Sequence, residues 1–309
     1  MLASPLPKKI LFIALLTLSL IPTVTAPMAL LAGILYAIFL GNPFASQSAL
    51  GVKWLLKAAV IGLGFGMSIT TAVAAGREGL LLTVATLIVV MGAGFLLGKW
   101  LKVDSKSSYL VSSGTAICGG SAIAALAPIT GANARQISVA LGTVFILNAV
   151  ALFVFPLIGA GMGLSQYQFG LWSAIAIHDT SSVVGAASAY GNEALATATT
   201  VKLSRALWIV PLSLVTALFS RRTGRISIPY FIFLFIGAMA VSSAFPEFNE
   251  AYQSISWIAK RLLVATLFLI GSGLSLETLK SVGVRVFAQG MILWILISAL
   301  SLAAILIFY

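Results

Sequence analysis

The sequence is poor in charge and poorest in acidic residues. Only 8% of its 309 residues are charged, only 7 are Asp or Glu, and 60% are hydrophobic, giving a mean hydropathy of +1.11. A soluble domain of this length needs far more charge to cover its surface. The composition therefore predicts an all-α protein that crosses a membrane many times, with residues 1–309 forming a single transmembrane unit.

Three further shortages exclude specific chemistry. Cys118 is the only cysteine, which excludes an intramolecular disulfide. The sequence has no Gly-x-x-x-x-Gly-Lys-Ser/Thr motif, so we do not expect this chain to hydrolyse ATP. No metal or cofactor site is predicted. The formal net charge of +11 would suggest a nucleic-acid ligand in a soluble protein, but here the cations lie mostly in short loops that orient a membrane protein. No nucleic-acid partner is expected.

Hydropathy predicts about eleven membrane spans, in a range of about ten to eleven. Many apolar runs reach the roughly 17–25 residues that a helix needs to cross a bilayer. The approximate limits are 10–25, 28–45, 53–72, 79–99, 107–129, 136–160, 168–190, 194–219, 228–245, 255–277 and 286–309.

The basic loops predict the orientation of the chain. With eleven spans, the four main basic clusters fall on one side, which we expect to be the cytoplasmic side of a bacterial inner membrane. The N-terminus is then cytoplasmic and the C-terminus lies outside. These clusters are Lys8 and Lys9; Lys99, Lys102 and Lys106; Arg221, Arg222 and Arg225; and Lys280 and Arg285. Arg77 and Arg135 are exceptions, placed on the outer side with Glu193, Glu247 and Glu250.

Two segments resemble each other without gaps. Residues 53–78 align with residues 260–285, so that Gly64 and Gly66 match Gly271 and Gly273. The spans concerned are the third and the tenth, which run in opposite directions, and inverted repeats of this kind are typical of secondary transporters. A chance similarity between helices rich in small residues is the alternative. The four glycines are also candidate points of helix unwinding or of close helix packing.

The fifth span contains a segment that is a poor continuous helix. Within Ser112–Ala125, the pair Gly119-Gly120 adds backbone freedom at mid-span. A break there would leave the amides of the next helix open, and such a helix N-terminus attracts anions. Close helix packing is the equally weighted alternative. The candidate substrate-binding residues are Ser113, Thr115, Cys118, Gly119, Gly120 and Ser121.

The seventh span contains the only histidine. His178 and Asp179 lie in an apolar run, and polar groups inside a membrane span are candidates for function. Asp179 or the hydroxyl residues after it can cap a new helix, which predicts a second break. The alternative is a capped helix end at the membrane surface. The candidate binding residues are His178, Asp179, Thr180, Ser181 and Ser182.

Two cations lie inside the eighth span. Lys202 and Arg205 are three positions apart and share one helix face. Buried cations need partners, and Asp179 is the nearest acid that also lies within a span. One hypothesis is a structural ion pair between Asp179 and one of these cations. The other is that Asp179 neutralises one cation and leaves the second for an anionic substrate, a role that suits the arginine fork.

The chain resembles a known family at these motifs. Ser112–Ala125, His178–Ala187 and Lys202–Trp208 are similar to segments of the YeiH family of bacterial inner-membrane proteins, whose members are named as sulfate exporters. The resemblance implies two inverted repeats, a scaffold domain, and a mobile core with broken helices that cross near the midplane. It also implies a possible homodimer through the scaffold. A five-plus-five arrangement would pair span five with span ten, whereas the alignment above pairs span three with span ten. Both pairings stay open.

We expect a secondary transporter of a small anion, either sulfate or a small organic or sulfonate anion, driven by an ion gradient. The coupling ion would be a proton or Na⁺, and His178 could carry the proton because imidazole titrates near neutral pH. A membrane scaffold or sensor without transport is one alternative. The other is an intramembrane enzyme with Cys118 as nucleophile and His178 as base. Helix geometry disfavours it, because adjacent His178 and Asp179 would point about 100° apart. No enzymatic activity is therefore expected.

Overall fold

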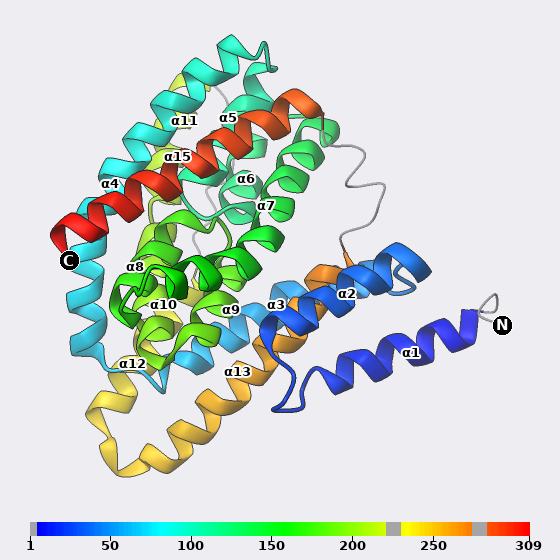
Figure 1. Cartoon of the computed structure of the whole chain (residues 1–309), viewed down its shortest axis with the longest axis vertical. Coiled ribbons are helices and arrows are strands. Elements are labelled where there is room, and N and C mark those ends of the chain that lie inside the picture. Colours follow the sequence, from blue (N-terminus) through cyan, green and yellow to red (C-terminus); the bar gives the residue numbers. More distant parts are fainter. Residues whose placement is uncertain (1–4, 221–229, 274–282) are drawn as a thin grey trace. The chain divides into compact units, whose positions relative to one another are not determined.

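The fold is all helical over the residues that the structure describes (Figure 1). The structure is a computed structural model, which describes residues 5–220, 230–273 and 283–309. The predicted polytopic all-α architecture is confirmed. Among the described residues, 5 helical stretches are long and apolar enough to cross a membrane. They are Leu82–Trp100, Arg135–Gly161, Asn192–Leu218, Pro246–Ser272 and Val284–Phe308.

The helices fall close to the predicted spans. Two spans are divided where a break was expected, and the eighth is divided between Ala206 and Ile209, where none was expected. The elements are α1 (Pro5–Leu18), α2 (Ala26–Leu40), α3 (Ala45–Gly64), α4 (Ile69–Trp100), α5 (Ser105–Ala116), α6 (Gly120–Thr130), α7 (Ala134–Gly161), α8 (Gln166–Ala176), α9 (Thr180–Tyr190), α10 (Asn192–Ala206), α11 (Ile209–Ser220), α12 (Phe231–Ala244), the 3-10 turn η1 (Pro246–Phe248), α13 (Asn249–Ser272) and α15 (Val284–Phe308).

The chain divides into two compact units. Unit 1 comprises residues 1–71 and 230–276, and unit 2 comprises residues 72–229 and 277–309. Both units are apolar, so hydropathy alone shows no boundary between them. Every predicted substrate-binding residue, from Ser113 to Arg205, lies in unit 2.

Unit 1 is built around an antiparallel pair, α3 and α13. A side chain added at Gly51 would meet Leu269, and one added at Gly62 would meet Ala259, so the contacts run in opposite directions along the two helices. Helix α2 also packs on α13, and α12 packs on α3. Small residues allow these backbones to approach closely, as in other membrane helix pairs.

The predicted repeat glycines lie at the ends of these helices. Gly64 ends α3 and packs on the Phe235 carbonyl of α12, while Gly271 near the end of α13 packs on the Leu30 carbonyl of α2. Gly66 follows α3 at a turn against Ser256, and Gly273 caps α13. These glycines therefore serve close packing and helix termination, and no mid-span unwinding occurs at them. Residues 274–282 of the second segment, with Lys280, lie outside the described residues, as do Arg221, Arg222 and Arg225.

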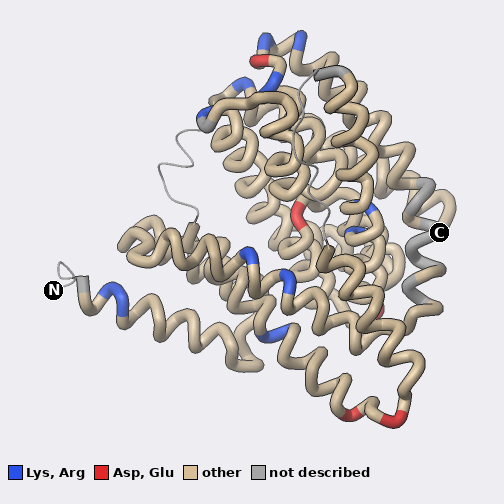
Figure 2. Tube along the Cα trace, turned by 180° about the vertical axis from the view of Figure 1, so that it is seen from behind, with Lys and Arg blue, Asp and Glu red and all other residues tan. Residues whose placement is uncertain are grey.

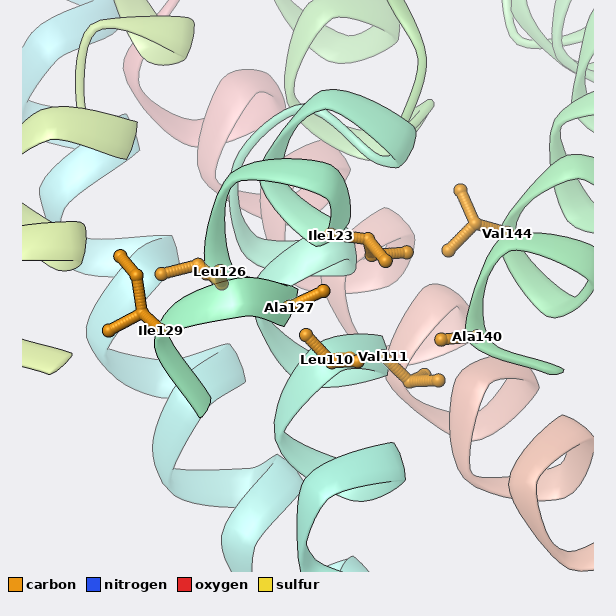
Figure 3. Close-up of a cluster of buried hydrophobic side chains, with 8 residues drawn as sticks. All are labelled: Leu110, Val111, Ile123, Leu126, Ala127, Ile129, Ala140 and Val144. Carbon is orange, nitrogen blue, oxygen red and sulfur yellow. The ribbon is translucent and has the colours of Figure 1, made fainter. Parts of the chain in front are cut away.

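In unit 2 the fifth predicted span is a re-entrant hairpin. Helices α5 and α6 pack on each other, with the Lys106 ammonium donating to the Gly131 carbonyl at 2.7 Å at the open end. Nearer the bend, a side chain at Gly114 would meet Ile123. Figure 3 shows the apolar contact that holds the arms together and against α7. Its buried residues are Leu110, Val111, Ile123, Leu126, Ala127, Ile129, Ala140 and Val144.

The seventh predicted span is a second hairpin, formed by α8 and α9. The rings of Phe169 and Tyr190 stack with centroids 3.9 Å apart, and the Tyr190 hydroxyl donates to the Leu164 carbonyl at 2.7 Å. Both contacts join the beginning of α8 to the end of α9. The chain therefore returns to the face from which it entered.

The hairpins approach from opposite ends of α7, a helix of 28 residues. Ala140, near its start, belongs to the apolar cluster of the first hairpin, whereas Phe155, nearer its end, stacks on Trp172 of the second with centroids 4.2 Å apart. At about 1.5 Å per residue, α7 is long enough to span a bilayer. Figure 1 likewise shows α5, α6 and α11 toward one end of unit 2 and α8, α9 and α10 toward the other.

The hairpins change how two of the predicted spans run. Spans five and seven each turn back at their break, so neither is a single continuous span. The residues after α6, including Arg135, then lie at the same end of unit 2 as the basic residues before α5. Figure 2 shows basic residues gathered at one end of this unit. The sequence count missed this arrangement because hydropathy measures apolar length and carries no direction.

Asp104 caps α5 at the start of the first hairpin. Its carboxylate accepts hydrogen bonds from the Ser107 amide at 3.0 Å and from the Gln136 side chain at 2.7 Å. Partial desolvation would raise the pKa of this carboxyl, but the hydrogen bonds outweigh it and hold the pKa below its usual value. A lowered pKa means that Asp104 stabilises the fold above the pKa of the unfolded chain, and that this contribution is lost as the pH falls through the folded pKa.

We expect Asp104→Ala to lower stability by about 1 kcal/mol, as for loss of other helix caps. Thermal unfolding in detergent measures this change. The difference between the variant and the wild type should shrink when the pH is lowered into the acidic range where the carboxyl is protonated. A difference that grows as the pH falls would contradict this role.

Candidate functional site

The tips of the two hairpins meet inside unit 2. The first tip is Ile117–Gly119, between α5 and α6, and the second is Ile177–Asp179, between α8 and α9. A side chain added at Gly119 would lie 3.4 Å from the backbone and Cβ of His178. The structure therefore brings together the two helix breaks that the sequence predicted, at Gly119-Gly120 and around Asp179.

Local backbone geometry makes each tip. Gly119 has φ 63° and ψ −121°, a combination that residues with a Cβ rarely adopt. Its amide donates to the Gly114 carbonyl at 2.8 Å, which closes the turn after α5. At the second tip the extended residues Ile177 and Asp179 separate α8 from α9.

Lys202 joins the tips. Its ammonium donates to the carbonyls of Ile117 at 3.2 Å, Ala174 at 3.2 Å and Ile177 at 2.6 Å. A lysine ammonium has three N–H donors, so these carbonyls use them all. Lys202 is fully buried. Because Ile117 and Ile177 occupy matching positions in the two tips, one side chain fastens both hairpins at their ends.

Arg205 fastens the first tip to α4. Its Nε donates to the Ile117 carbonyl at 3.1 Å, and one terminal nitrogen donates to the Thr86 hydroxyl at 3.0 Å. The other terminal nitrogen donates to the Ala116 carbonyl. A cation at the C-terminal end of a helix is also stabilised by the partial negative charge of the free carbonyls of that helix. Arg205 is fully buried, like Lys202.

Asp179 does not pair with either cation among the described contacts, which corrects the ion-pair hypothesis. Its carboxylate accepts from the Ser181 amide at 3.2 Å and from the Ser181 hydroxyl, and so caps α9. The predicted helix break and cap at Asp179 are present. The sequence hypothesis was wrong about the partners because backbone carbonyls freed by the breaks leave no trace in a sequence. Those carbonyls, and not a carboxylate, receive the hydrogen bonds of Lys202 and Arg205.

His178 lies fully buried at the second tip, and neither of its ring nitrogens has a hydrogen-bond partner among the described residues. Its backbone amide donates to the Asn148 side-chain oxygen of α7 at 3.1 Å, and the Asp179 amide lies 3.4 Å from the same oxygen. The Asn148 side-chain nitrogen is buried and also unpartnered. Most buried polar groups are hydrogen bonded, so these atoms mark a place where a partner is missing.

Helix α6 begins at the first tip without a side-chain cap from Gly119. Cys118 is a buried free thiol at this tip. Ser121 is exposed while its neighbour Gly120 is half-buried. The beginning of α6 is therefore less enclosed than the buried beginning of α9.

The other predicted binding residues line the arms of the hairpins. Ser113 is buried and donates to the Leu110 carbonyl of its own helix, whereas the buried Thr115 hydroxyl has no partner. Thr180 and Ser182 lie buried in the first turn of α9. Gly64, Gly66, Gly271 and Gly273 belong to unit 1 and are not part of this cluster.

The sequence did not predict Thr86 as a partner of Arg205. For Asn148 it favoured a hydrogen bond between helices over a role in binding. That bond is present, but it holds the second tip in place. The sequence did contain a signal for the paired tips. When residues 113–121 of the first hairpin are aligned with residues 173–181 of the second, a shift of 60 positions (173 − 113), several residues around the two tips are identical. The identical pairs are Ser113 and Ser173, Ala116 and Ala176, Ile117 and Ile177, and Ser121 and Ser181. This pairing of spans five and seven differs from both sequence alternatives.

Comparison with known proteins places the chain in a family. Residues 9–302 match the family model described as Conserved hypothetical protein 698. The chain is 49% identical over 306 residues to a UPF0324 membrane protein of Vibrio vulnificus, covering 97% of this chain and 98% of the relative. It is 49% identical over 288 residues to a UPF0324 membrane protein of Bacteroides thetaiotaomicron, covering 91% and 86% respectively.

A third relative, a UPF0324 membrane protein of Geobacter sulfurreducens, is 46% identical over 294 residues, 95% of each chain. No solved structure matches the chain. These relatives correspond to the YeiH family to which the motifs pointed, so that expectation is confirmed. The chain belongs to the Conserved hypothetical protein 698 family of UPF0324 membrane proteins.

Proposed function

We propose that this protein is a secondary transporter of a small anion and that the hairpin tips hold the substrate. One observation carries the proposal: two re-entrant hairpins, entering from opposite ends of α7, touch at Gly119 and His178. Irregular backbone at membrane depth is tolerated only inside protein or beside water, and in transporters it forms the substrate site. The opposed hairpins suit alternating access, because each arm pair separates the tips from one side of the membrane.

The charges at the tips support an anionic substrate. Lys202 and Arg205 are buried beside the tips, and the carboxylate of Asp179 is the acid that shares this centre. Helices α6 and α9 both begin here, and helix N-termini favour negative charge. Because backbone carbonyls occupy all three donors of Lys202, this cation contributes through its field and through positioning, without direct contact with substrate.

The free ring nitrogens of His178 make it the leading contact for the anion. The same ring is the candidate carrier of a coupling proton, with Na⁺ as the alternative coupling ion. An enzymatic role for Cys118 and His178 is less well supported, because neither ring nitrogen of His178 has a hydrogen-bond partner among the described residues, so the ring does not contact the thiol as a base would. We therefore propose binding and transport without covalent chemistry.

We also propose the orientation that the basic loops favour in a bacterial inner membrane. Replacing two spans by hairpins does not change whether the number of crossings is odd or even. The N-terminus therefore lies in the cytoplasm and the C-terminus outside, the orientation that the sequence also predicted. Arg135 now joins the basic residues on the cytoplasmic side, which leaves Arg77 as the remaining exception to the positive-inside rule. Unit 1 serves as the scaffold in this proposal, and two copies of the chain pair through it.

The test is transport by the purified chain in proteoliposomes with an imposed pH or Na⁺ gradient. The panel contains labelled sulfate, small sulfonates and small carboxylates. We expect at least one anion to move faster than in protein-free vesicles, and His178→Ala to slow it by about tenfold or more, the effect of losing about 1.4 kcal/mol of binding. If the whole panel moves no faster than in protein-free vesicles, the transporter proposal fails. In that case a scaffold or sensor becomes the leading function.

A further inference from the structure

We propose that the hairpin tips select a monovalent oxyanion, such as an organic sulfonate or carboxylate, over divalent sulfate. The inference rests on the proposed transport function and narrows its substrate class. It follows from the charges that the described residues place at the tips.

The hydrogen bonds assign a charge to each ionisable group in the cluster. Lys202 donates to three carbonyls, which requires an ammonium with three N–H groups, since a neutral amine has two. Arg205 is a guanidinium in any protein setting. The Asp179 carboxyl accepts hydrogen bonds at Oδ2 from the amide and hydroxyl of Ser181, and its position at the N-terminus of α9 favours the ionised carboxylate.

The charged groups of the protein at the tips are Lys202, Arg205 and Asp179, and their sum is the resident charge of the site. Two cations face one carboxylate, so the resident charge is one positive charge (2 − 1 = 1). Among the described residues, the other titratable groups that face this centre are Cys118 from the first tip and His178 from the second, whose ordinary forms at pH 8 are a neutral thiol and a neutral imidazole. From α7 the facing polar group is Asn148, which carries no charge. A monoanion neutralises this centre, whereas a dianion replaces one excess positive charge by one excess negative charge.

An uncompensated charge is costly in a buried site, whatever its sign. A dianion therefore enters favourably only when a proton accompanies it, and His178 is the vacant acceptor for that proton. A monoanion needs no such proton. At a pH above neutrality, where protons are scarce, the preference for the monoanion should be largest.

Two isosteric substitutions change the resident charge in opposite directions. Asp179→Asn removes the carboxylate and raises the resident charge to two, while an amide oxygen can still cap α9. Asn148→Asp keeps the oxygen that accepts from the His178 and Asp179 amides and lowers the resident charge to zero. Ser188→Ala is the matched control, because Ser188 bonds only the Gly185 carbonyl of its own helix.

The experiment measures uptake of labelled methanesulfonate and labelled sulfate into proteoliposomes at pH 8, a pair of oxyanions similar in shape and different in charge. We expect the wild type and Ser188→Ala to prefer methanesulfonate by about tenfold or more, equivalent to about 1.4 kcal/mol. Asp179→Asn should shift the ratio toward sulfate, and Asn148→Asp should weaken uptake of both anions.

The outcomes separate this inference from the transport proposal. Equal or preferred uptake of sulfate by the wild type at pH 8 overturns the charge rule and leaves transport standing. An unchanged ratio in a folded Asp179→Asn protein overturns it as well. If Asp179→Asn does not fold, Asn148→Asp decides: undiminished uptake of methanesulfonate contradicts the rule. Absence of uptake of any anion by the wild type rejects the transport proposal itself.

Discussion

Replacement of Lys202 by methionine is expected to abolish transport and to destabilise the protein by several kcal/mol. The substitution keeps the length of the side chain and removes all three donors. The carbonyls of Ala174 and Ile177 would then lose their hydrogen bond at a buried position, while the Ile117 carbonyl would keep the one from Arg205. A buried acceptor left unpaired costs about 1–3 kcal/mol, so the loss of two is a large part of the stability of an ordinary domain.

The loss should act at the tips in particular, because Lys202 is the side chain that contacts both. Thermal unfolding in detergent and anion uptake in proteoliposomes measure the two effects. Lys57→Met is the control, since Lys57 belongs to unit 1 and its ammonium meets the Tyr230 hydroxyl at an exposed site. A change there should stay within about 0.5 kcal/mol. Wild-type uptake and stability in Lys202→Met would show that the tips do not depend on this residue.

The second large effect is expected from Gly119→Ala. The backbone at this position has φ 63° and ψ −121°, and a conformation confined to glycine costs of the order of 1–3 kcal/mol for another residue. The added methyl group would also lie 3.0 Å from Val144 and 3.4 Å from His178. The first tip must therefore change its shape or move away from the second, and we expect uptake to fall by about tenfold or more.

Gly92→Ala is the matched control. Gly92 lies inside α4, and a methyl group there would meet no atom within 4 Å. Alanine favours a helix interior by about 0.5–1 kcal/mol, so this variant should be as stable as the wild type or more stable. Uptake rates of the two variants, compared with their melting temperatures, separate a local effect at the tip from a general loss of folding. Equal uptake by Gly119→Ala and wild type would refute the proposed fit of the tips.

Much of the site was predictable from the sequence. Paired glycines at 119 and 120, and a capping acid at 179, weaken a helix wherever it lies, so both breaks were found. The polar residues around them, and the two cations of α10, were also found because they stand out in an apolar chain. Most helix limits followed from the lengths of the apolar runs.

Hydropathy and helix-breaking residues did not predict that the chain folds back into a hairpin at each break. A helix that continues and a helix that folds back have the same hydropathy, and the difference rests on contacts such as Lys106 with Gly131 and Phe169 with Tyr190. The partners of Lys202 and Arg205 were missed for a related reason. Backbone carbonyls become acceptors only once the helices end, and every residue type supplies the same carbonyl.

The arrangement of the hairpins can be tested by labelling single cysteines from one side of the membrane. In a Cys118→Ser background, one cysteine replaces exposed Ser105 at the start of α5 or exposed Arg135 after α6, with Glu193→Cys at the opposite end of unit 2 as reference. An impermeant maleimide is applied to sealed cells and to inverted vesicles. The hairpin predicts that positions 105 and 135 react from the same side and position 193 from the other. Reaction of positions 105 and 135 from opposite sides would contradict the hairpin and, with it, the proposed site at the tips.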